Sequence, residues 1–426
     1  MRKHVHRWYC AQRDLLSPQA IGAVTLGMNE LQAAISEAKV NRGRIRIKME
    51  ELEFAANKWL KPYPNAAWRE NVEVLLVAIA VAMGIRTFFI QPFKIPTGSM
   101  QPTLYGVTST PDFLPVFNDI GTGLTDRTKI QAEINDQLRS QQAIKIPPIL
   151  GRIRDWFHGI SYVHFVAPTD GSVEAITKPW PPAFFPIYQH IEFAGKWHTI
   201  WFPPDYGEEL LEVRSGFDYP LRDGEAINLL KGRVFRKGED VLKLRVHAGD
   251  HLFVDRLTYN FRPPRRGEIV VFDTHDITGL PPDQQNTFYI KRLVGLGGET
   301  LSLQQDYVVE NVPRLGTVPV GHLVVDGQPL SASTPHFANL YSFPGVRPGQ
   351  KVLQYQPDHY YGHALLQALA PGKTFQDATN HYFVMGDNTF NSSDSRYWGD
   401  FSSDHVIGKS FFVYWPITRR FGWGNQ

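Results

Sequence analysis

The longest apolar run of the chain covers residues 72–90. Its charge-free centre is twelve residues long, and the residues up to Ile90 extend the run to about nineteen. Twelve apolar residues are typical of a buried helix in a soluble protein, whereas about nineteen can cross the hydrocarbon of a bilayer. Glu73 and Arg86 lie near the two ends, where long charged side chains can reach the headgroups. The pattern favours a transmembrane helix over residues 72–90, and a buried core helix is the alternative.

Helical spacing of apolar residues also occurs before this run, within residues 1–70. It is seen in LQAAISEAKV, where Asn29 is the expected N-cap, and in KMEELEFAANKWL. Such helices either pack on another element or lie on anionic lipid. The segment holds twelve Lys or Arg residues against seven Asp or Glu residues. This basic excess predicts a cytoplasmic helical segment at residues 1–70, with everything after Ile90 on the outer side of the membrane.

The chain just after the apolar run cannot be helical. Pro92 and Pro96 favour extended backbone, and the sequence TGSMQPTL follows. Ser99 therefore lies nine positions after Ile90, in a turn where Gly98 permits unusual backbone angles. From composition alone, an ordinary serine in a Gly/Pro turn is the simplest interpretation of Ser99.

The C-terminal part of the chain alternates apolar and polar residues, which predicts β-strands. The strands are expected in GDHLFVDRLTYNF, IVVFDT, NTFYIKRLVGLGGETLSL and VIGKSFFVYWPI, with a hairpin around Asp326-Gly327. Tyr289, Lys291 and Leu293 share one face of their strand, so apolar side chains flank the lysine. An edge-strand lysine that protects against aggregation is the alternative for Lys291.

Two segments interrupt this pattern. Residues 106–248 carry no obvious chemical motif. We expect helix over 127–155, with a proline break, and short strands over 160–248. This predicts an inserted β-rich domain of unknown role, for which a lid, a docking surface and a spacer all fit. A smaller insertion is expected at residues 331–379.

The composition fits a mainly β protein and excludes several functions. There are 31 Pro and 35 Gly residues, and the net charge is only +2, which argues against a nucleic-acid partner. Cys10 is the single cysteine, so neither an intramolecular disulfide nor a multi-cysteine zinc site is possible. His359 and His363 have the spacing of a helical metal pair, but Tyr360 replaces the required Glu, so no metal or cofactor is expected.

These patterns combine into one predicted architecture. We expect an antiparallel β-sheet domain made of residues 91–105 and 249–426, with the β-rich domain of residues 106–248 inserted into it. One N-terminal transmembrane helix anchors the chain. No feature of the sequence indicates an oligomeric state.

Four motifs resemble a known family. IPTGSMQPTL, GDHLFVDRLTYN…PRRGEIVVF, YIKRLVGLGGE and MGDNTFNSSDSRYWG occur in this order after the apolar run. Together they resemble the four catalytic-domain boxes of the bacterial type I signal peptidases (leader peptidases). The resemblance covers about residues 72–104 and 249–418, less the smaller insertion. It implies a membrane-bound serine endopeptidase with a Ser/Lys dyad, which removes N-terminal signal peptides from exported precursor proteins.

The resemblance also implies roles for individual residues. Ser99 matches the nucleophile and Lys291 the general base, while Ser392 matches a serine that orients the lysine. Thr97 matches the position whose hydroxyl joins the backbone N–H of Ser99 in an oxyanion hole.

Four further residues match positions that support the site structurally. Asp394 and Arg396 match a charged pair, and Asp387 and Asn388 fall in the GDN triplet of the family. Thr389 stands where the family usually has arginine, which puts the charge network of this loop in doubt more than the activity.

The chemistry requires a neutral lysine, because a serine hydroxyl must lose its proton as it attacks. An ordinary lysine pKa of about 10.4 leaves only about one molecule in 2,500 neutral at pH 7. Burial lowers a lysine pKa by up to roughly 3–5 units, and a three-unit drop costs about 4 kcal/mol of stability. We therefore predict that Lys291 is nearly buried and within hydrogen-bond reach of Ser99, with Tyr289, Leu293 and Met100 as candidate neighbours.

The expected substrates are secretory precursors, whose apolar signal segment lies in the bilayer and whose cleavage site emerges near the headgroups. An extended peptide would add to a strand edge, with Ile95 and Pro96 as candidate walls of shallow pockets. The expected location is the bacterial inner (plasma) membrane, crossed once, with the catalytic domain on the periplasmic face.

Two other classes of function compete with this hypothesis. One is a membrane-tethered, non-catalytic binding or scaffold protein on a degenerate signal-peptidase fold. The presence of Ser99, Lys291 and Ser392 together speaks against it, because an inactive relative would be expected to lose one of them. The other is a self-cleaving Ser/Lys protease joined to a DNA-binding domain, against which the near-zero net charge and the apolar run both speak.

Overall fold

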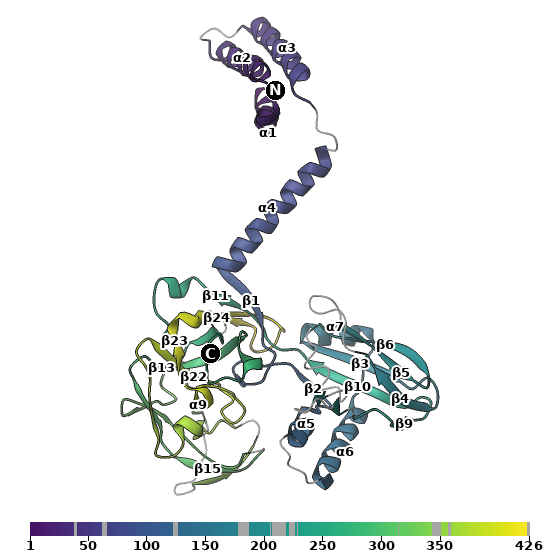
Figure 1. The fold of residues 1–426 in the computed structure, drawn as a ribbon, viewed down its shortest axis with the longest axis vertical. Coiled ribbons are helices and arrows are strands. Elements are labelled where there is room, and N and C mark those ends of the chain that lie inside the picture. The colour runs from purple at the N-terminus through teal and green to yellow at the C-terminus, as the bar shows by residue number, and fades with distance from the viewer. Residues whose placement is uncertain are drawn as a thin grey trace. The chain divides into compact units, whose positions relative to one another are not determined.

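The fold is known from a computed structural model. It describes residues 1–37, 41–61, 66–121, 127–177, 187–204, 206, 219–220, 226–227, 229–313, 315–342, 351–356 and 359–423. The chain forms two compact units, residues 1–83 and residues 84–426. The first is helical, and the second is built mainly from antiparallel β-sheets with a few helices (Figure 1). The prediction of a mainly β protein is confirmed.

The N-terminal unit holds helices α1 (Arg2–Gln12), α2 (Pro18–Ile35) and α3 (Arg42–Trp59). The apolar faces of α2 and α3 are buried against each other, which was one of the two predicted alternatives. Asn41 caps α3, because its Oδ1 accepts hydrogen bonds from two backbone N–H groups. The core consists of Val5, Val24, Met28, Leu31, Leu52 and Leu60.

The predicted start of the first of these helices is wrong. Asn29 lies inside α2, which begins eleven residues earlier at Pro18. Ser17 is the N-cap, and its Oγ accepts a hydrogen bond from the backbone N–H of Ala20. Proline in the first turn has the φ angle that a helix needs, so the Ser-Pro pair begins the helix. Residues 38–40, the predicted end of this helix, lie outside the described residues.

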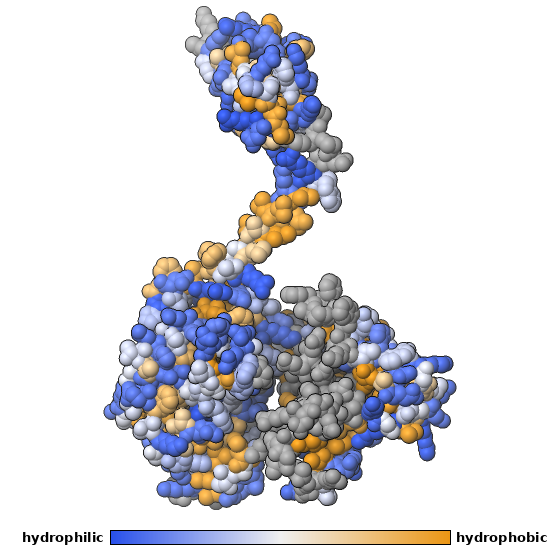
Figure 2. Space-filling model, viewed as in Figure 1, coloured by the Kyte–Doolittle hydropathy of each residue, from blue (hydrophilic) through white to orange (hydrophobic). Residues whose placement is uncertain are grey.

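Helix α4 (Ala66–Phe88) contains the apolar run. Residues Trp68–Phe88 are long and apolar enough to cross a membrane, and none of this span is buried against the described protein. Figure 2 shows apolar side chains along α4. The alternative of a buried core helix is therefore wrong for this structure. An exposed apolar surface of this length is unfavourable in water, and it fits a candidate membrane span.

One eight-stranded antiparallel sheet forms the centre of the second unit. The strands lie in the order β1-β11-β24-β12-β13-β22-β23, with β25 paired to β24. Their bounds are β1 (Ile90–Lys94), β11 (His251–Asp255), β12 (Ile269–Asp273), β13 (Phe288–Leu296), β22 (His381–Met385), β23 (Phe401–Ser402), β24 (Val406–Trp415) and β25 (Gly422–Trp423). Because β13 has a neighbour on each side, the alternative of an edge-strand lysine at Lys291 is wrong.

Two four-stranded sheets adjoin this centre. Each combines strands that precede residue 331, the start of the predicted smaller insertion, with strands that follow it. Strands β19 to β21 pair with β14 to β16, so residues 331–379 share sheets with the strands that precede them. The predicted hairpin at Asp326-Gly327 is present. The bounds are β14 (Thr300–Leu303), β15 (Tyr307–Val312), β16 (Gly316–Gly321), β17 (Leu323–Val325), β18 (Gln328–Pro329), β19 (Val352–Gln354), β20 (His363–Ala364) and β21 (Thr374–Gln376).

Residues 106–248 contain helices as well as strands. The helix expected over 127–155 is two helices, separated around Pro147-Pro148 as the proline break predicts. The described helices are α5 (Leu114–Gly121), α6 (Arg127–Ala143) and α7 (Ile149–Phe157). The described strands are β2 (Thr108–Thr110), β3 (Ile160–Val166), β4 (Gly171–Ile176), β5 (Ile187–Phe193), β6 (Lys196–Phe202), β7 (Tyr219–Pro220), β8 (Ala226–Ile227), β9 (Val234–Phe235) and β10 (Asp240–His247). Other strands predicted between 178 and 228 lie outside the described residues.

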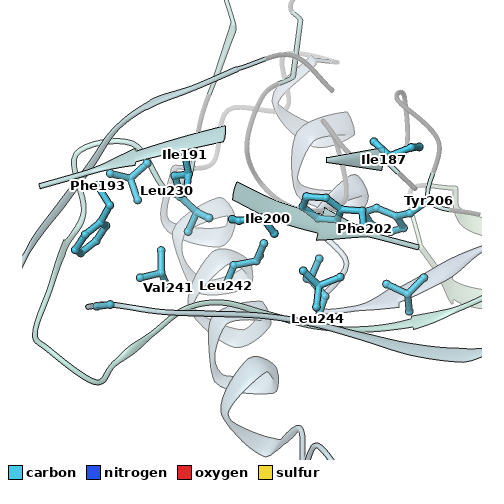
Figure 3. Close-up of a cluster of buried hydrophobic side chains, with 14 of the residues drawn as sticks. Ile187, Ile191, Phe193, Ile200, Phe202, Tyr206, Leu230, Val241, Leu242 and Leu244 are labelled. Carbon is cyan, nitrogen blue, oxygen red and sulfur yellow. The ribbon is translucent and has the colours of Figure 1, made fainter. Parts of the chain in front are cut away.

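This segment has a hydrophobic core of its own. Side chains of β5 and β6, such as Ile191 and Phe202, face those of β10, such as Leu242 and Leu244 (Figure 3). The sheets β2-β10-β3 and β6-β5-β4-β9 contribute most of this core. Single-turn 3-10 helices complete the chain at Arg13–Leu15, Thr258–Asn260, Pro282–Gln284, Gln367–Leu369 and Ser403–His405.

The two ends of the inserted segment are fastened together beside the main sheet. The backbone N–H of Tyr105 donates to Oδ2 of Asp250 (2.8 Å), and the N–H of Asp250 donates to the carbonyl of Tyr105 (2.8 Å). The buried Asp250 carboxylate also pairs with Arg420, whose guanidinium lies 4.0 Å from the centre of the Tyr105 ring. With both ends joined, a long insertion can be accommodated without displacing the chain around Ser99.

The core of the inserted segment gives a direct stability prediction. Leu244 is fully buried in the middle strand of the sheet β2-β10-β3, so Leu244→Ala should leave a cavity. We expect the free energy of unfolding to fall by about 2–5 kcal/mol. Trp197→Ala, at a position that is 53% exposed, should change it by less than about 1 kcal/mol. Urea unfolding of the two variants measures the difference, and equal losses would show that this core is not formed.

Candidate active site

Ser99 lies in a turn that is anchored on both sides by buried apolar residues. Ile95 follows β1 and donates its backbone N–H to the carbonyl of Asp250 (3.0 Å). Ile95, Met100 and Leu104 are each 0–1% exposed and pack into the core under β11, β12 and β24. Ser99 itself is 8% exposed. The turn is therefore fixed by its neighbours rather than by the serine.

The loop after β22 holds this turn from the other side. Asn388 donates its backbone N–H to the carbonyl of Ser99 (3.0 Å) and its Nδ2–H to the carbonyl of Gly98 (3.0 Å). The approach requires glycine at Gly386, because a Cβ there would lie 2.2 Å from Oγ of Ser392 and 2.4 Å from the carbonyl oxygen of Ser99. The GDN triplet therefore packs closely against the serine turn.

Lys291 comes from the middle of β13 and meets Ser99 in the interior. Its Nζ and the Oγ of Ser99 are 2.6 Å apart, and Lys291 is 5% exposed. The lysine is thus nearly buried and in contact with Ser99, as the sequence analysis expects. The ring of Tyr289 is the neighbour on the same strand face, with its centre 5.4 Å from Nζ.

The environment of Lys291 makes its amine easier to deprotonate. Burial is the largest effect, and it lowers the pKa of Lys291 to about 8. The carboxylates of Asp394 and Asp387 act in the opposite direction, and the guanidinium of Arg396 adds to the lowering. At pH 7 a pKa of about 8 leaves roughly one amine in ten neutral, far more than an ordinary lysine.

Asp394 and Arg396 form a fully buried ion pair. Nε and Nη2 of Arg396 donate to the two carboxylate oxygens at 2.9 and 2.8 Å. Asp394 also caps the short helix α9 (Ser395–Trp398) and accepts the backbone N–H of Gly386. Burial alone would raise the pKa of Asp394, but Arg396 and the hydrogen bonds lower it below its ordinary value. The carboxylate stays charged beside the lysine.

Thr389 joins this buried network in place of the arginine that is usual in the family. Its Oγ1 accepts hydrogen bonds from the backbone N–H of Ala364 (2.6 Å) and from Nη1 of Arg396 (3.2 Å). Its carbonyl accepts a second bond from the same Nη1 (2.8 Å). The network around Arg396 is therefore well connected in this chain with threonine at this position.

Arg292 is a site residue that the sequence analysis missed. It lies on the face of β13 opposite Lys291, is 1% exposed, and pairs with Asp387 through two bonds of 2.7 and 2.6 Å. Thr103 donates its hydroxyl to the same carboxylate. The pair connects β13, the GDN loop and the segment after Ser99. A charged residue inside a predicted buried strand requires a partner, and this requirement could have pointed to Asp387.

The remaining predicted site residues make fewer contacts that bear on their predicted roles. Ser392 is 7% exposed, and its hydroxyl lies close enough to Asp394 to help lower the pKa of that carboxyl, whereas the hydrogen bond that the described residues give Lys291 goes to Ser99. Its predicted contact with the lysine therefore stays a prediction. Thr97 and Pro96 are exposed, whereas the side chain of Ile95 lies in the core and offers almost no surface to a ligand.

Metal-binding side chains do not gather in the described residues, where no group of three or more His, Cys, Asp or Glu is arranged to hold an ion. His363 is buried, and its Nδ1 lies 2.9 Å from the hydroxyl of Tyr341. Burial lowers the pKa of His363 to about 3, so it is a neutral core residue.

The chain matches the family model described as "Signal peptidase, peptidase S26" over residues 68–109 and 242–415, about half of its length. It belongs to this family of signal peptidases, and the resemblance drawn from the four motifs is confirmed. Residues 110–241 lie outside the match. Ser99, Lys291 and the GDN loop all lie within it.

Several curated relatives are signal peptidases. Signal peptidase I of Leptolyngbya laminosa is 29% identical over 174 residues, covering 41% of this chain and 64% of that protein. The probable signal peptidase I-2 of a Synechocystis strain is 28% identical over 174 residues, covering 41% of this chain and 59% of that protein. Signal peptidase I of Helicobacter pylori J99 is 26% identical over 187 residues, covering 36% of this chain and 56% of that protein. The chain spans about three fifths of the length of these relatives.

A solved structure also matches part of the chain. The crystal structure of a signal peptidase I from Enterococcus faecalis V583 is 26% identical, covers 35% of this chain and 97% of that one, and has a TM-score of 0.21.

The Arg292–Asp387 pair leads to a stability prediction. Asp387→Asn would leave the buried guanidinium without its counter-charge, and we expect the free energy of unfolding to fall by about 3–5 kcal/mol. Glu50→Gln breaks an exposed ion pair with Arg46 and should cost no more than about 1 kcal/mol. Urea unfolding compares the two variants. A loss of less than 1 kcal/mol for Asp387→Asn would contradict the account of this pair.

Proposed function

We propose that this chain is a membrane-bound serine endopeptidase that removes signal peptides from secretory precursors with a Ser/Lys dyad. Ser99 is the nucleophile and Lys291 the general base. One observation carries the proposal: a buried lysine with a pKa of about 8 lies 2.6 Å from the hydroxyl of a serine in the matching family motif. A structural lysine would gain more stability from solvent or from a carboxylate than from this contact.

The first half of the reaction cleaves the peptide bond. Neutral Nζ of Lys291 accepts the proton of the Ser99 hydroxyl as Oγ attacks the scissile carbonyl carbon. The tetrahedral intermediate collapses, and the protonated amine of Lys291 donates its proton to the leaving nitrogen. The mature polypeptide departs with a free amino terminus, and the signal peptide remains as an ester on Ser99.

The second half restores the enzyme. Lys291, neutral again, accepts a proton from a water molecule as this water attacks the ester carbonyl. The second tetrahedral intermediate expels Oγ of Ser99, which recovers its proton from Lys291. The signal peptide leaves with a carboxylate, and no cofactor is needed because each proton moves between the dyad and the substrate.

The oxyanion of both intermediates needs hydrogen-bond donors. We assign this role to the backbone N–H of Ser99 and the hydroxyl of Thr97, which is exposed two residues before the nucleophile. One donor of this kind typically contributes about 3 kcal/mol to transition-state stabilisation.

The surrounding polar groups position the dyad. Ser392 orients the lysine amine, and a neutral hydroxyl suits this role because a carboxylate there would raise the lysine pKa. Asp394 and Arg396 hold the loop that carries Ser392, while Asp387 and Asn388 hold the serine turn.

The proposed substrate and location are supported by the position of the site in the chain. The candidate span Trp68–Phe88 is followed directly by β1, and Ser99 comes eleven residues after Phe88. A precursor whose signal segment lies in the same bilayer would present its cleavage site at this level. We propose that residues 1–70 are cytoplasmic and that the catalytic region faces the periplasm of a bacterial inner membrane.

The bound precursor would lie along β1, which is an end strand of the main sheet and pairs with β11 among the described strands. A free strand edge offers main-chain hydrogen bonds to an extended peptide. Pro96 is exposed near this edge, and the backbone of Ile95 continues it, so both stay candidate residues for contacts with small side chains.

Cleavage of a purified precursor tests the proposal. Ser99→Ala and Lys291→Met should each lower kcat/KM by at least about 10³-fold, since residues of a catalytic unit fail together. For the native protein, kcat/KM should rise about tenfold per pH unit below pH 8 and level off above it, because the neutral amine is the active form and its pKa is about 8.

Two exposed positions supply matched controls, Ser333→Ala and Lys373→Met, and both should cleave at the native rate. Native-like cleavage by Ser99→Ala would overturn the proposed nucleophile. A pH profile that is flat between pH 6 and 8 would overturn the proposed base.

A further inference from the structure

A cavity of about 640 Å³ opens directly beside the serine turn. Gln101, two residues after Ser99, forms part of its wall, and so does Asn388, which donates to the carbonyls of Ser99 and Gly98. A molecule in this cavity would therefore lie beside the serine turn, although Ser99 and Lys291 themselves are not part of the wall. The cavity is too large for a single side chain, and its volume is typical of a ligand site.

Much of the wall comes from the two segments that were predicted as insertions. Tyr355 and Tyr360 belong to residues 331–379, and Glu133 lies on α6 of the segment outside the family match. These residues converge with the GDN loop on one space. The convergence gives the insertions a direct relation to the site.

The position of the cavity indicates which part of a precursor would reach it. The precursor would approach Ser99 from the side of β1, because β1 follows the candidate membrane span. Val312 at the end of β15, Pro313, and Leu315 just before β16 form part of the cavity wall. In Figure 1, β15 lies at the end of the catalytic region away from β1. The residues after the scissile bond would therefore continue into the cavity.

The chemistry of the wall suits an extended peptide. Tyr355 and Phe390 form an edge-to-face pair with ring centres 5.8 Å apart, and Tyr360 adds a third aromatic ring. Amide groups of Gln101 and Asn388 provide polar contacts. Among the described residues of the wall there are two carboxylates, Glu133 and Asp387, and no lysine or arginine. Asp387 is paired with Arg292, and Glu133 also takes part in an interaction within the protein. The surface therefore favours apolar, aromatic or basic side chains over acidic ones.

We propose that this cavity binds the first residues of the mature polypeptide, immediately downstream of the scissile bond, and that Tyr360 is a main contact. This inference rests on the proposed function, because it assigns a substrate segment to the same site. The cavity then makes the enzyme sensitive to the amino terminus of the mature protein, and not only to the signal peptide.

Two peptides with the same signal sequence test the inference on the full-length protein in detergent. The long peptide carries eight residues after the scissile bond, without acidic side chains, and the short peptide carries one residue and an amide. We expect the native protein to show a KM about tenfold lower for the long peptide. Tyr360→Ala should raise this KM about tenfold and leave kcat/KM for the short peptide within twofold, since an aromatic contact is typically worth a factor of this size.

Matched variants separate the possible outcomes. Trp197→Ala removes an exposed aromatic ring outside the cavity wall and should change neither peptide. A long peptide with two acidic residues after the bond should have a raised KM, which Glu133→Gln lowers. Equal effects of Tyr360→Ala on both peptides, or no effect on either, would overturn the inference. Ser99→Ala tests the proposed function separately, because loss of cleavage of the short peptide, which does not extend into the cavity, reports on the nucleophile alone.

Discussion

The burial of one amine is the constraint on which the rest of the structure depends. Lys291 can act as a base only when it is neutral, and roughly one amine in ten is neutral at pH 7 only because β13 carries the lysine into the interior beside Ser99. The folded site gives up its proton near pH 8, whereas the unfolded chain holds it up to about pH 10.5. The buried amine therefore costs about 3 kcal/mol of stability at neutral pH, and this cost disappears as the pH rises from 8 to 10.5.

The charges around the lysine are arranged so that they do not cancel this effect. Two carboxylates, Asp394 and Asp387, are close enough to raise the pKa of Lys291, and both are buried. Each forms a bidentate pair with its own arginine, Arg396 or Arg292. The pairs fasten the GDN loop to the serine turn and to β13. The same contacts thus give the site its geometry. They also limit how far the negative charge of the two carboxylates raises the pKa of Lys291.

The long insertion is compatible with this geometry because its ends are joined outside the dyad. The contacts between Tyr105, Asp250 and Arg420 close the segment next to the main sheet. The body of the segment has its own core, so its folding does not draw on the apolar residues that support Ser99. Two helices of this segment, α5 and α6, nevertheless reach the cavity beside the site. An insertion of this kind can alter substrate selection without disturbing the catalytic groups.

The sequence was most informative where a local pattern determines the structure. Alternation in YIKRL identified a strand with Lys291 among apolar neighbours, and the Asp326-Gly327 pair identified a hairpin, because both depend on a few adjacent residues. Ser99 could be connected to Lys291 only through the family motifs. Their contact joins residues 192 positions apart, and no local pattern encodes such a contact.

The errors have a related cause. Asn29 was chosen as an N-cap because it precedes an apolar periodic stretch, but Ser17-Pro18 begins the helix earlier with a better first turn. Arg292 was not recognised as a site residue, because its partner Asp387 is 95 positions away. The helices of the inserted segment were partly missed for the same reason, since the short helix α5 is decided by packing rather than by its own sequence.

The pKa of Lys291 is the most direct test of the central claim. It can be measured by NMR titration of the full-length protein in detergent, with selectively ¹⁵N-labelled lysine side chains and Lys291→Met to assign the signal. The account predicts a midpoint near pH 8, well below that of the exposed lysines. A midpoint above pH 10 would show that fewer than about one amine in a thousand is neutral at pH 7 and would contradict the role of Lys291 as the base.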